Sequence, residues 1–136
     1  MLDDYGHHPT EIRVTLASLA QAFPERRLLV AFQPHRYSRT RALLPEFFPV
    51  FAPASLVFVT EIYAAGEARL NGISGRAVYD GIHRTGHPGV HFVEEKAALT
   101  ARLCQHLQPG DLVLTLGAGD IWKTGEELLA RLQGEG

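Results

Sequence analysis

The opening stretch of the chain combines several side chains that could bind an anion or exchange a proton. Residues 3–11 read Asp-Asp-Tyr-Gly-His-His-Pro-Thr-Glu. Pro9 suits the first position of a helix, because the N–H that proline lacks would have no partner there. The amides of such a helix start carry partial positive charge and lie near Asp4, His7 and His8. The pattern predicts a turn where an anion docks or the pKa of an ionisable group is tuned.

Two residues of this turn have several open roles. Asp4 could orient a histidine, hold Mg²⁺ through water, accept a hydrogen bond from an amine, or simply complement the helix dipole. His8 could contact a substrate or nucleotide, or merely close the turn. The sequence does not separate these roles.

A second group of charged residues follows a short apolar run. Arg36 and Arg39 are three residues apart, and on a helix they would share a face. Each guanidinium group can donate two parallel hydrogen bonds to a carboxylate or phosphate. Because loops at the end of a buried strand often carry function, we interpret the pair as a ligand site rather than a solvated helix start.

Two other patterns point to less specific chemistry. His7 and His8 could bind a metal together with His35, but no cysteine spacing or paired-histidine spacing supports zinc, and we predict no metal site.

Residues 117–124 resemble a phosphate-binding P-loop, except that Trp122 stands where that loop needs glycine. We interpret these glycines as a tight turn. Cys104 is expected to be a small apolar residue of a helix.

Alternating helices and strands must position these side chains. Apolar periodicity predicts helices over 9–23, 38–51, 74–85, from 94 onward and from 121 onward, with strands at 28–32, 56–60, 90–93 and 112–116. Pro45 and Pro49 predict a kink, or two short pieces, in the second helix. Ser74 is expected to cap the third helix and Gly86 to end it. The pattern is typical of the α/β class, with a three-layer, mainly parallel, Rossmann-like sheet covered by helices on both faces.

In such sheets, ligands bind beyond the carboxyl ends of the strands. Three polar turns, 33–39, 61–67 and 117–120, follow predicted strands. The turn at 4–8 would join them if residues 2–4 pair as a short strand. The sequence therefore predicts that the polar residues converge on one edge of the sheet.

Composition places limits on the classes of protein to consider. With 136 residues, 46% of them hydrophobic and 21% charged, the chain is expected to form a single domain, 1–136. A net charge of −2 gives no electrostatic reason to expect a nucleic-acid partner. No apolar run approaches the length of a membrane span, and one cysteine cannot form an internal disulfide, so we expect a cytoplasmic protein without a membrane partner.

Four stretches together resemble a known family. Residues 3–12, 32–40, 61–67 and 117–121 are similar, in this order, to the C-terminal domain of the Mur ligases. The resemblance is closest to the branch that joins L-alanine to UDP-N-acetylmuramate. The murein tripeptide ligases share the His-His-Pro turn, but the Gln-Pro-His-Arg-Tyr sequence from Gln33 to Tyr37 favours the alanine branch.

The resemblance implies a ligase of three domains that serves peptidoglycan synthesis. One domain binds the UDP-sugar and a central domain binds ATP and Mg²⁺, and the third closes over the site and supplies the amino-acid pocket. ATP converts the muramate carboxylate into an acyl phosphate, which the amine of L-alanine attacks. The sequence begins where that third domain begins, so we expect the N-terminal and central domains to be absent, no cofactor to bind tightly, and the isolated chain to be inactive.

The resemblance also implies roles for individual residues. Tyr5, His7, Arg36 and Arg39 would bind the substrate, and Asp4 and His7 would be catalytic. The residues that contact a cofactor are left open, with His8, Glu61 and Tyr63 as the candidates.

Three other functions remain open at this stage. The chain could be a stand-alone α/β module that binds an amino acid or nucleotide, or the corresponding domain of a murein tripeptide ligase. A Rossmann oxidoreductase is disfavoured because no Gly-x-Gly-x-x-Gly opens the first strand–helix unit.

Overall fold

Five parallel strands form one sheet in the computed structural model, which describes residues 2–4 and 8–135. The strands are β1 (Leu2–Asp4), β2 (Leu28–Phe32), β3 (Leu56–Val59), β4 (Val90–Phe92) and β5 (Leu112–Leu116). Their order across the sheet is β1-β5-β2-β3-β4. The short strand at residues 2–4 does form, and it pairs with β5 so that Asp4 lies opposite Leu116.

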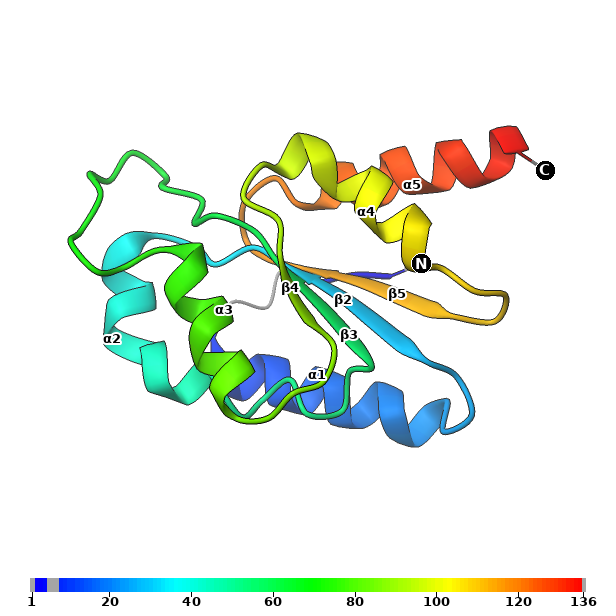
Figure 1. Ribbon diagram of the computed structural model, residues 1–136, viewed down its shortest axis with the longest axis horizontal. Coiled ribbons are helices and arrows are strands. Elements are labelled where there is room, and N and C mark those ends of the chain that lie inside the picture. Colours follow the sequence, from blue (N-terminus) through cyan, green and yellow to red (C-terminus); the bar gives the residue numbers. More distant parts are fainter. Residues whose placement is uncertain (1, 5–7, 136) are drawn as a thin grey trace.

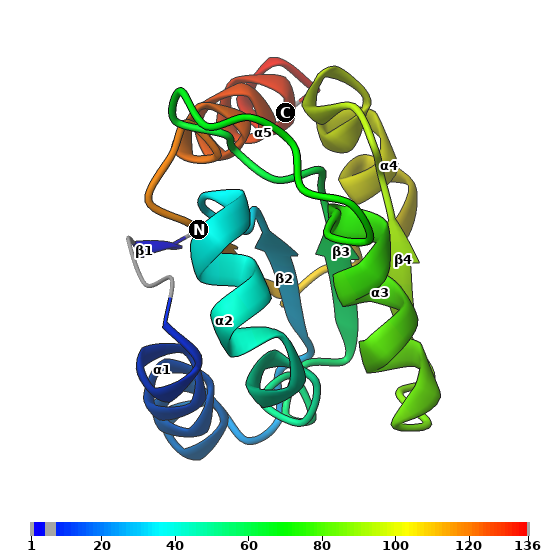
Figure 2. The ribbon, with the colours of Figure 1, turned by 90° about the vertical axis from the view of Figure 1, so that its left-hand side faces the viewer.

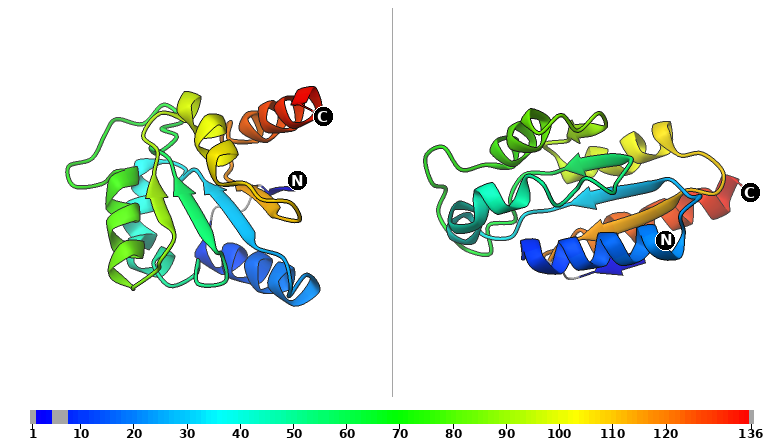
Figure 3. Two further views of the ribbon diagram at one scale, coloured as in Figure 1. Left: turned by 45° about the vertical axis from the view of Figure 1, so that its right-hand side comes forward. Right: turned by 90° about the horizontal axis from the view of Figure 1, so that it is seen from below.

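Helices cover both faces of this sheet, as Figures 1 and 2 show. One layer contains α1 (Pro9–Ala22), α2 (Tyr37–Phe47) and α3 (Gly75–Arg84). The other contains α4 (Leu99–His106), which a 3₁₀ turn at Lys96–Ala98 precedes, and α5 (Trp122–Glu135). In the left-hand view of Figure 3, the strands lie between these two helical layers. The predicted three-layer α/β architecture is confirmed.

The central strands are buried on both faces, as their apolar runs predict. Leu28, Val30 and Phe32 pack into the core beneath α1, α2 and α3. Leu29 and Ala31 point the other way, into a second core with α4 and α5. This alternation is the two-residue period of a strand. Cys104 packs against the second core as a free thiol, in agreement with the small apolar role predicted for it.

The second helix is not divided at Pro45, as the sequence had suggested. Helix α2 continues through Pro45 and ends at Phe47, so the prediction of two short helical pieces within 38–51 is wrong. Pro45 lies in the last turn, where its missing N–H removes one hydrogen bond and leaves the earlier turns intact. Pro49 lies beyond the end, in the turns that lead to β3.

The predicted limits of α3 are confirmed. The Ser74 hydroxyl accepts a hydrogen bond from the Ala77 N–H at 3.1 Å, and the helix ends before Gly86, which has a φ of +90°.

Two leucines of α5, Leu129 and Leu132, are exposed, at 40% and 42%. None of the helices among the described residues is both long and apolar enough to span a lipid bilayer.

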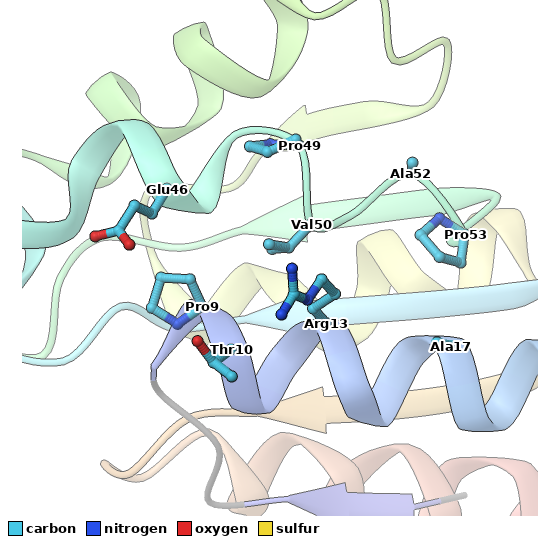
Figure 4. Close-up of a pocket in the computed structure, with 9 residues that line it drawn as sticks. All are labelled: Pro9, Thr10, Arg13, Ala17, Glu46, Pro49, Val50, Ala52 and Pro53. Carbon is cyan, nitrogen blue, oxygen red and sulfur yellow. The ribbon is translucent and has the colours of Figure 1, made fainter.

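A groove of about 530 Å³ separates the start of α1 from the segment that links α2 to β3. Figure 4 shows residues of α1 along one wall and residues 46–53 along the other. The lining residues are Pro9, Thr10, Arg13, Ala17, Glu46, Pro49, Val50, Ala52 and Pro53. None of the described residues that the sequence assigns to the site lines this groove.

Candidate functional site at the carboxyl edge of the sheet

The carboxyl ends of β1, β2, β3 and β5 lie at the same edge of the parallel sheet. The Gln33 N–H donates to the Leu116 carbonyl at 2.9 Å, and the Thr60 N–H donates to the Phe32 carbonyl at 3.0 Å. The Gly117 N–H donates to the Asp4 carbonyl at 3.0 Å. The convergence predicted from the topology is therefore confirmed for the described parts of the turns that follow these strands.

A buried glutamine links the turn after β2 to the turn after β5. The Gln33 side-chain amide donates to the Asp120 carboxylate at 2.9 Å and accepts from the Ile121 N–H at 3.1 Å. Lys96, which precedes α4, forms an ion pair with Asp120 at 2.7 Å. Partial burial on its own would raise the pKa of Asp120, but the hydrogen bonds from Lys96 and Gln33 outweigh it, and the pKa is lowered. The Asp120 carboxylate is therefore held in its charged form between two donors.

The turn after β3 joins this arrangement through Tyr63. The Tyr63 N–H donates to the Pro34 carbonyl and the Arg36 N–H donates to the Tyr63 carbonyl, both at 2.8 Å. The Tyr63 ring is stacked on His35, with centroids 5.7 Å apart, and is 38% exposed. It also lies over Gly119, where a Cβ atom would come within 2.6 Å of Tyr63 Cγ. Only glycine at this position leaves room for the ring.

Arg36 and Arg39 lie at the start of α2 with exposed side chains. Arg36 precedes the helix with a φ of +65°, so the argument that both arginines share a helical face does not apply. The left-handed backbone is held by the bond from its N–H to Tyr63 and by Thr40, whose hydroxyl donates to the Arg36 carbonyl at 2.7 Å. Within the described ranges, neither guanidinium group has an ion-pair partner.

A carboxylate from the turn after β3 caps the same helix. Glu67 accepts from the Ser38 N–H at 3.1 Å and from the Ser38 hydroxyl at 2.5 Å. These two bonds, with a smaller contribution from the charge of Arg36, lower the pKa of Glu67. A negative charge at a helix N-terminus is stabilising, so Glu67 fixes the segment that presents the arginines.

Two residues predicted to contact a cofactor cap helices in this structure. His8 is the N-cap of α1, where its Nδ1 accepts from the Thr10 N–H at 3.1 Å and its own N–H donates to Glu11. The Glu61 carboxylate accepts from the Gly75 N–H at 2.6 Å, at the first residue of α3, and from the Ile62 N–H at 2.8 Å. For His8, closing a turn is thus the role that the structure displays.

The other predicted site residues divide into described and undescribed ones. The Asp4 carboxylate accepts from the Thr15 hydroxyl of α1 at 3.1 Å. Tyr5 and His7 lie outside the described residues. Among those described, no group of three or more histidine, cysteine, aspartate or glutamate side chains is arranged to hold a metal ion.

Sequence reasoning missed the part that Gln33, Lys96 and Thr15 play at this edge. A polar residue directly after the buried run 28–32 was a signal for Gln33. Lys96 and Thr15 had no local signal, because each reaches a partner on another element: Lys96 reaches Asp120 after β5, and Thr15 of α1 reaches Asp4 of β1.

Known proteins resemble this chain over nearly its whole length. Residues 1–119 match the family described as Mur ligase, glutamate ligase domain. The UDP-N-acetylmuramate–L-alanine ligase of Geobacter sulfurreducens is 51% identical over 98% of the chain and 29% of its own length. The corresponding ligase of Myxococcus xanthus is 53% identical over 98% of the chain and 28% of its own length.

Solved structures agree with this comparison. The UDP-N-acetylmuramate–alanine ligase of Thermotoga maritima superposes with a TM-score of 0.79 at 27% identity, over 97% of this chain and 26% of that one. A murein peptide ligase of Psychrobacter arcticus shares the fold, with a TM-score of 0.72 at 18% identity, over 94% of this chain and 26% of that one. The chain spans about 29% of the length of the curated relatives it matches. It belongs to the Mur ligase family.

Proposed function

We propose that the chain is the C-terminal, amino-acid-binding domain of an ATP-dependent ligase that joins L-alanine to UDP-N-acetylmuramate. The observation that carries the proposal is the pair of exposed guanidinium groups, Arg36 and Arg39, without ion-pair partners in the described ranges. They lie at the edge where parallel sheets bind ligands. Identities of 51% and 53% to alanine-adding ligases support this branch over the murein tripeptide ligases.

In the proposed reaction, the terminal phosphoryl group of ATP passes to the muramate carboxylate and gives an acyl phosphate and ADP. The nitrogen of L-alanine then attacks the carbonyl carbon, phosphate leaves, and the nitrogen loses a proton. Arg36 and Arg39 bind the alanine carboxylate through charge-assisted hydrogen bonds, which orients the amine. Asp4 and His7 are the proposed groups that handle the amine proton, with Tyr5 in the same pocket.

The described residues do not fit a magnesium ion held by this chain alone. The described carboxylates at the carboxyl edge accept hydrogen bonds from other partners: Asp4 from Thr15, Asp120 from Lys96 and Gln33, Glu61 from two amides, and Glu67 from Ser38. Among the described residues, no three histidine, cysteine, aspartate or glutamate side chains are grouped so that they could hold a metal ion. We therefore assign Mg²⁺ and the phosphates of ATP to other domains of the ligase. Tyr63, whose ring is exposed, is the remaining candidate here for a contact to the nucleotide.

The proposal extends to the organisation of the enzyme. The chain spans about 29% of the length of a matching ligase, and we assign the UDP-sugar and ATPase domains to the remainder, so the 136-residue chain alone is expected not to ligate. A cytoplasmic location is part of the same proposal, and the single free thiol of Cys104 suits a reducing compartment.

A chimeric enzyme tests this proposal. The matching C-terminal segment of the Geobacter sulfurreducens ligase is replaced by residues 1–136, and the release of phosphate that depends on L-alanine is measured. A control chimera carries the segment of the Myxococcus xanthus ligase, which is 53% identical to this chain.

We expect both chimeras to release phosphate with L-alanine and neither to do so with L-alaninamide, which lacks the carboxylate. Activity in the control chimera without activity in a folded test chimera would refute the assignment. A test chimera that uses a dipeptide or tripeptide in place of L-alanine would assign the chain to the murein tripeptide ligases instead.

A further inference from the structure

A second pocket lies at the opposite edge of the sheet from β1, along the outer side of β4. It has a volume of about 260 Å³ and shares no residue with the site at the carboxyl edge. Strand β4 runs between α3 on one face and α4 on the other (Figure 2). The pocket is lined by Arg76, Tyr79, Val90, His91, Phe92 and Arg102. Both helical layers therefore contribute to it.

The lining side chains concentrate positive charge without a carboxylate among them. Arg102 of α4 is half-buried and has no ion-pair partner among the described residues. The only ion pair of Arg76 among the described residues is with Asp80, at 3.4 Å, and both of these side chains are exposed, at 65% and 45%. An exposed pair of this kind contributes little, so it leaves most of the charge of Arg76 uncompensated.

Aromatic rings hold the guanidinium group of Arg76 in place. Its Cζ lies 5.4 Å from the centroid of the Tyr79 ring and 6.0 Å from that of Phe92. A guanidinium group that lies over ring faces keeps its N–H donors directed outward in its own plane. Less side-chain entropy is then lost when the group binds a ligand.

His91 and the edge of the strand add further donors. Burial, with smaller contributions from the charges of His106 and Arg102, lowers the pKa of His91. The Val57 N–H donates to the Gly89 carbonyl, and the Val93 N–H donates to the Val59 carbonyl. Because a parallel strand alternates its bonding sides, both the N–H and the C=O groups of Val90 and Phe92 face the open edge, and the N–H groups are the ones that an anion can use.

We propose that this pocket binds a small oxyanion, phosphate or the terminal group of a phosphomonoester, between Arg76 and Arg102. Two guanidinium forks on opposite sides of a strand can each donate parallel hydrogen bonds to different oxygens of one tetrahedral anion. The tetrahedral dianion uses more of these donors than a flat carboxylate would. The edge of β4 is thus a second ligand site of the chain, separate from the amino-acid pocket.

The test is an NMR titration of the 136-residue chain that follows the His91 imidazole signals. The ligands are inorganic phosphate, a nucleoside monophosphate, and chloride at matched ionic strength. The variants are Arg76→Gln and Arg102→Gln, and the matched control is Arg131→Gln, an exposed arginine of α5. Circular dichroism checks that each variant is folded.

We expect saturable shifts with phosphate but not with chloride, and affinity about tenfold weaker in each pocket variant than in the control. Equal affinity for phosphate and the monophosphate would assign recognition to the phosphate group alone. Tighter binding of the monophosphate would show that the nucleoside also touches the pocket. Shifts that chloride reproduces, that do not saturate, or that persist unchanged in both folded pocket variants would overturn the proposal.

Discussion

At the scale of single residues, Gly119 is the position where a minimal change tests the geometry of the carboxyl edge. A Cβ atom there would lie 2.6 Å from Tyr63 Cγ and 2.8 Å from Gln33 Oε1. Gly119→Ala must therefore displace the Tyr63 ring or break the link from Gln33 to Asp120. We expect a loss of about 1–3 kcal/mol in the free energy of unfolding, measured with urea, as for other overpacked sites.

Gly134→Ala is the matched control for this substitution. Gly134 lies in α5, and a Cβ atom there would meet nothing within 4 Å. Because alanine favours a helix more than glycine does, the control should be neutral or stabilising by up to about 1 kcal/mol. Equal effects of the two substitutions would contradict the crowding at Gly119.

The pH dependence of stability is also decided by single residues, and His91 gives the clearest expectation. Its pKa is lowered in the folded state, chiefly by burial and then by the charges of His106 and Arg102. The unfolded chain therefore binds the proton more readily, and stability falls as the pH drops from about 6.5 toward the lower folded pKa. The ring is stacked on Phe58 with centroids 5.0 Å apart, which keeps it from escaping into water.

His91→Phe keeps an aromatic ring against Phe58 and removes the titration. Urea unfolding at pH 7.5 and 5.5 should show a smaller loss of stability on acidification in this variant than in the unmodified chain. The same loss in both proteins would rule out His91 as the source.

At the scale of elements, the capped start of α2 connects the fold to the proposed pocket. Glu67 holds both the N–H and the hydroxyl of Ser38, between the two arginines. Glu67→Gln should loosen this segment and raise the hydrogen-exchange rate of the Ser38 amide severalfold, because a charged cap is lost. Glu46→Gln, near the other end of the same helix, should leave that rate unchanged. Equal rates in the two variants would show that the cap does not order the turn.

The sequence was sufficient to predict the elements whose signals are local. The buried run 28–32, the Ser74 cap and the stop at Gly86 depend on neighbouring residues, and the structure confirms each of them. Pro45 was misleading because one proline in a last turn costs only one hydrogen bond. The left-handed Arg36 could not be predicted, since its partner Tyr63 lies on another turn, 27 positions along the chain.

At the scale of the whole molecule, the parallel order of the strands accounts for the site. Turns far apart in the chain meet at one edge because every strand enters the sheet in the same direction. The link from Gln33 to Asp120, 87 residues away, depends on this arrangement. The topology predicted where polar residues gather, whereas the pairs that form among them required the structure.

At the amino ends of the strands, opposite the carboxyl edge, a bidentate ion pair joins Arg27 and Asp111. Arg27 donates to both carboxylate oxygens of Asp111, at 3.0 and 2.7 Å, and to the His106 carbonyl at 2.7 Å. The hydrogen bonds from Arg27 lower the pKa of Asp111, whose side chain is only 4% exposed. This pair joins the segments that lead into β2 and β5, at the end of the sheet away from the proposed amino-acid pocket.

The central claim is that Arg36 and Arg39 hold the carboxylate of L-alanine. The most direct measurement is the KM for L-alanine of the chimeric ligase with Arg36→Ala, with Arg39→Ala, and with Arg41→Ala as an exposed control on the same helix. Each of the first two variants should raise the KM for L-alanine about tenfold or more, because each removes a charge-assisted hydrogen bond. The KM for ATP, and both constants in the Arg41→Ala variant, should stay unchanged. An unaltered KM for L-alanine in both folded variants would contradict the account.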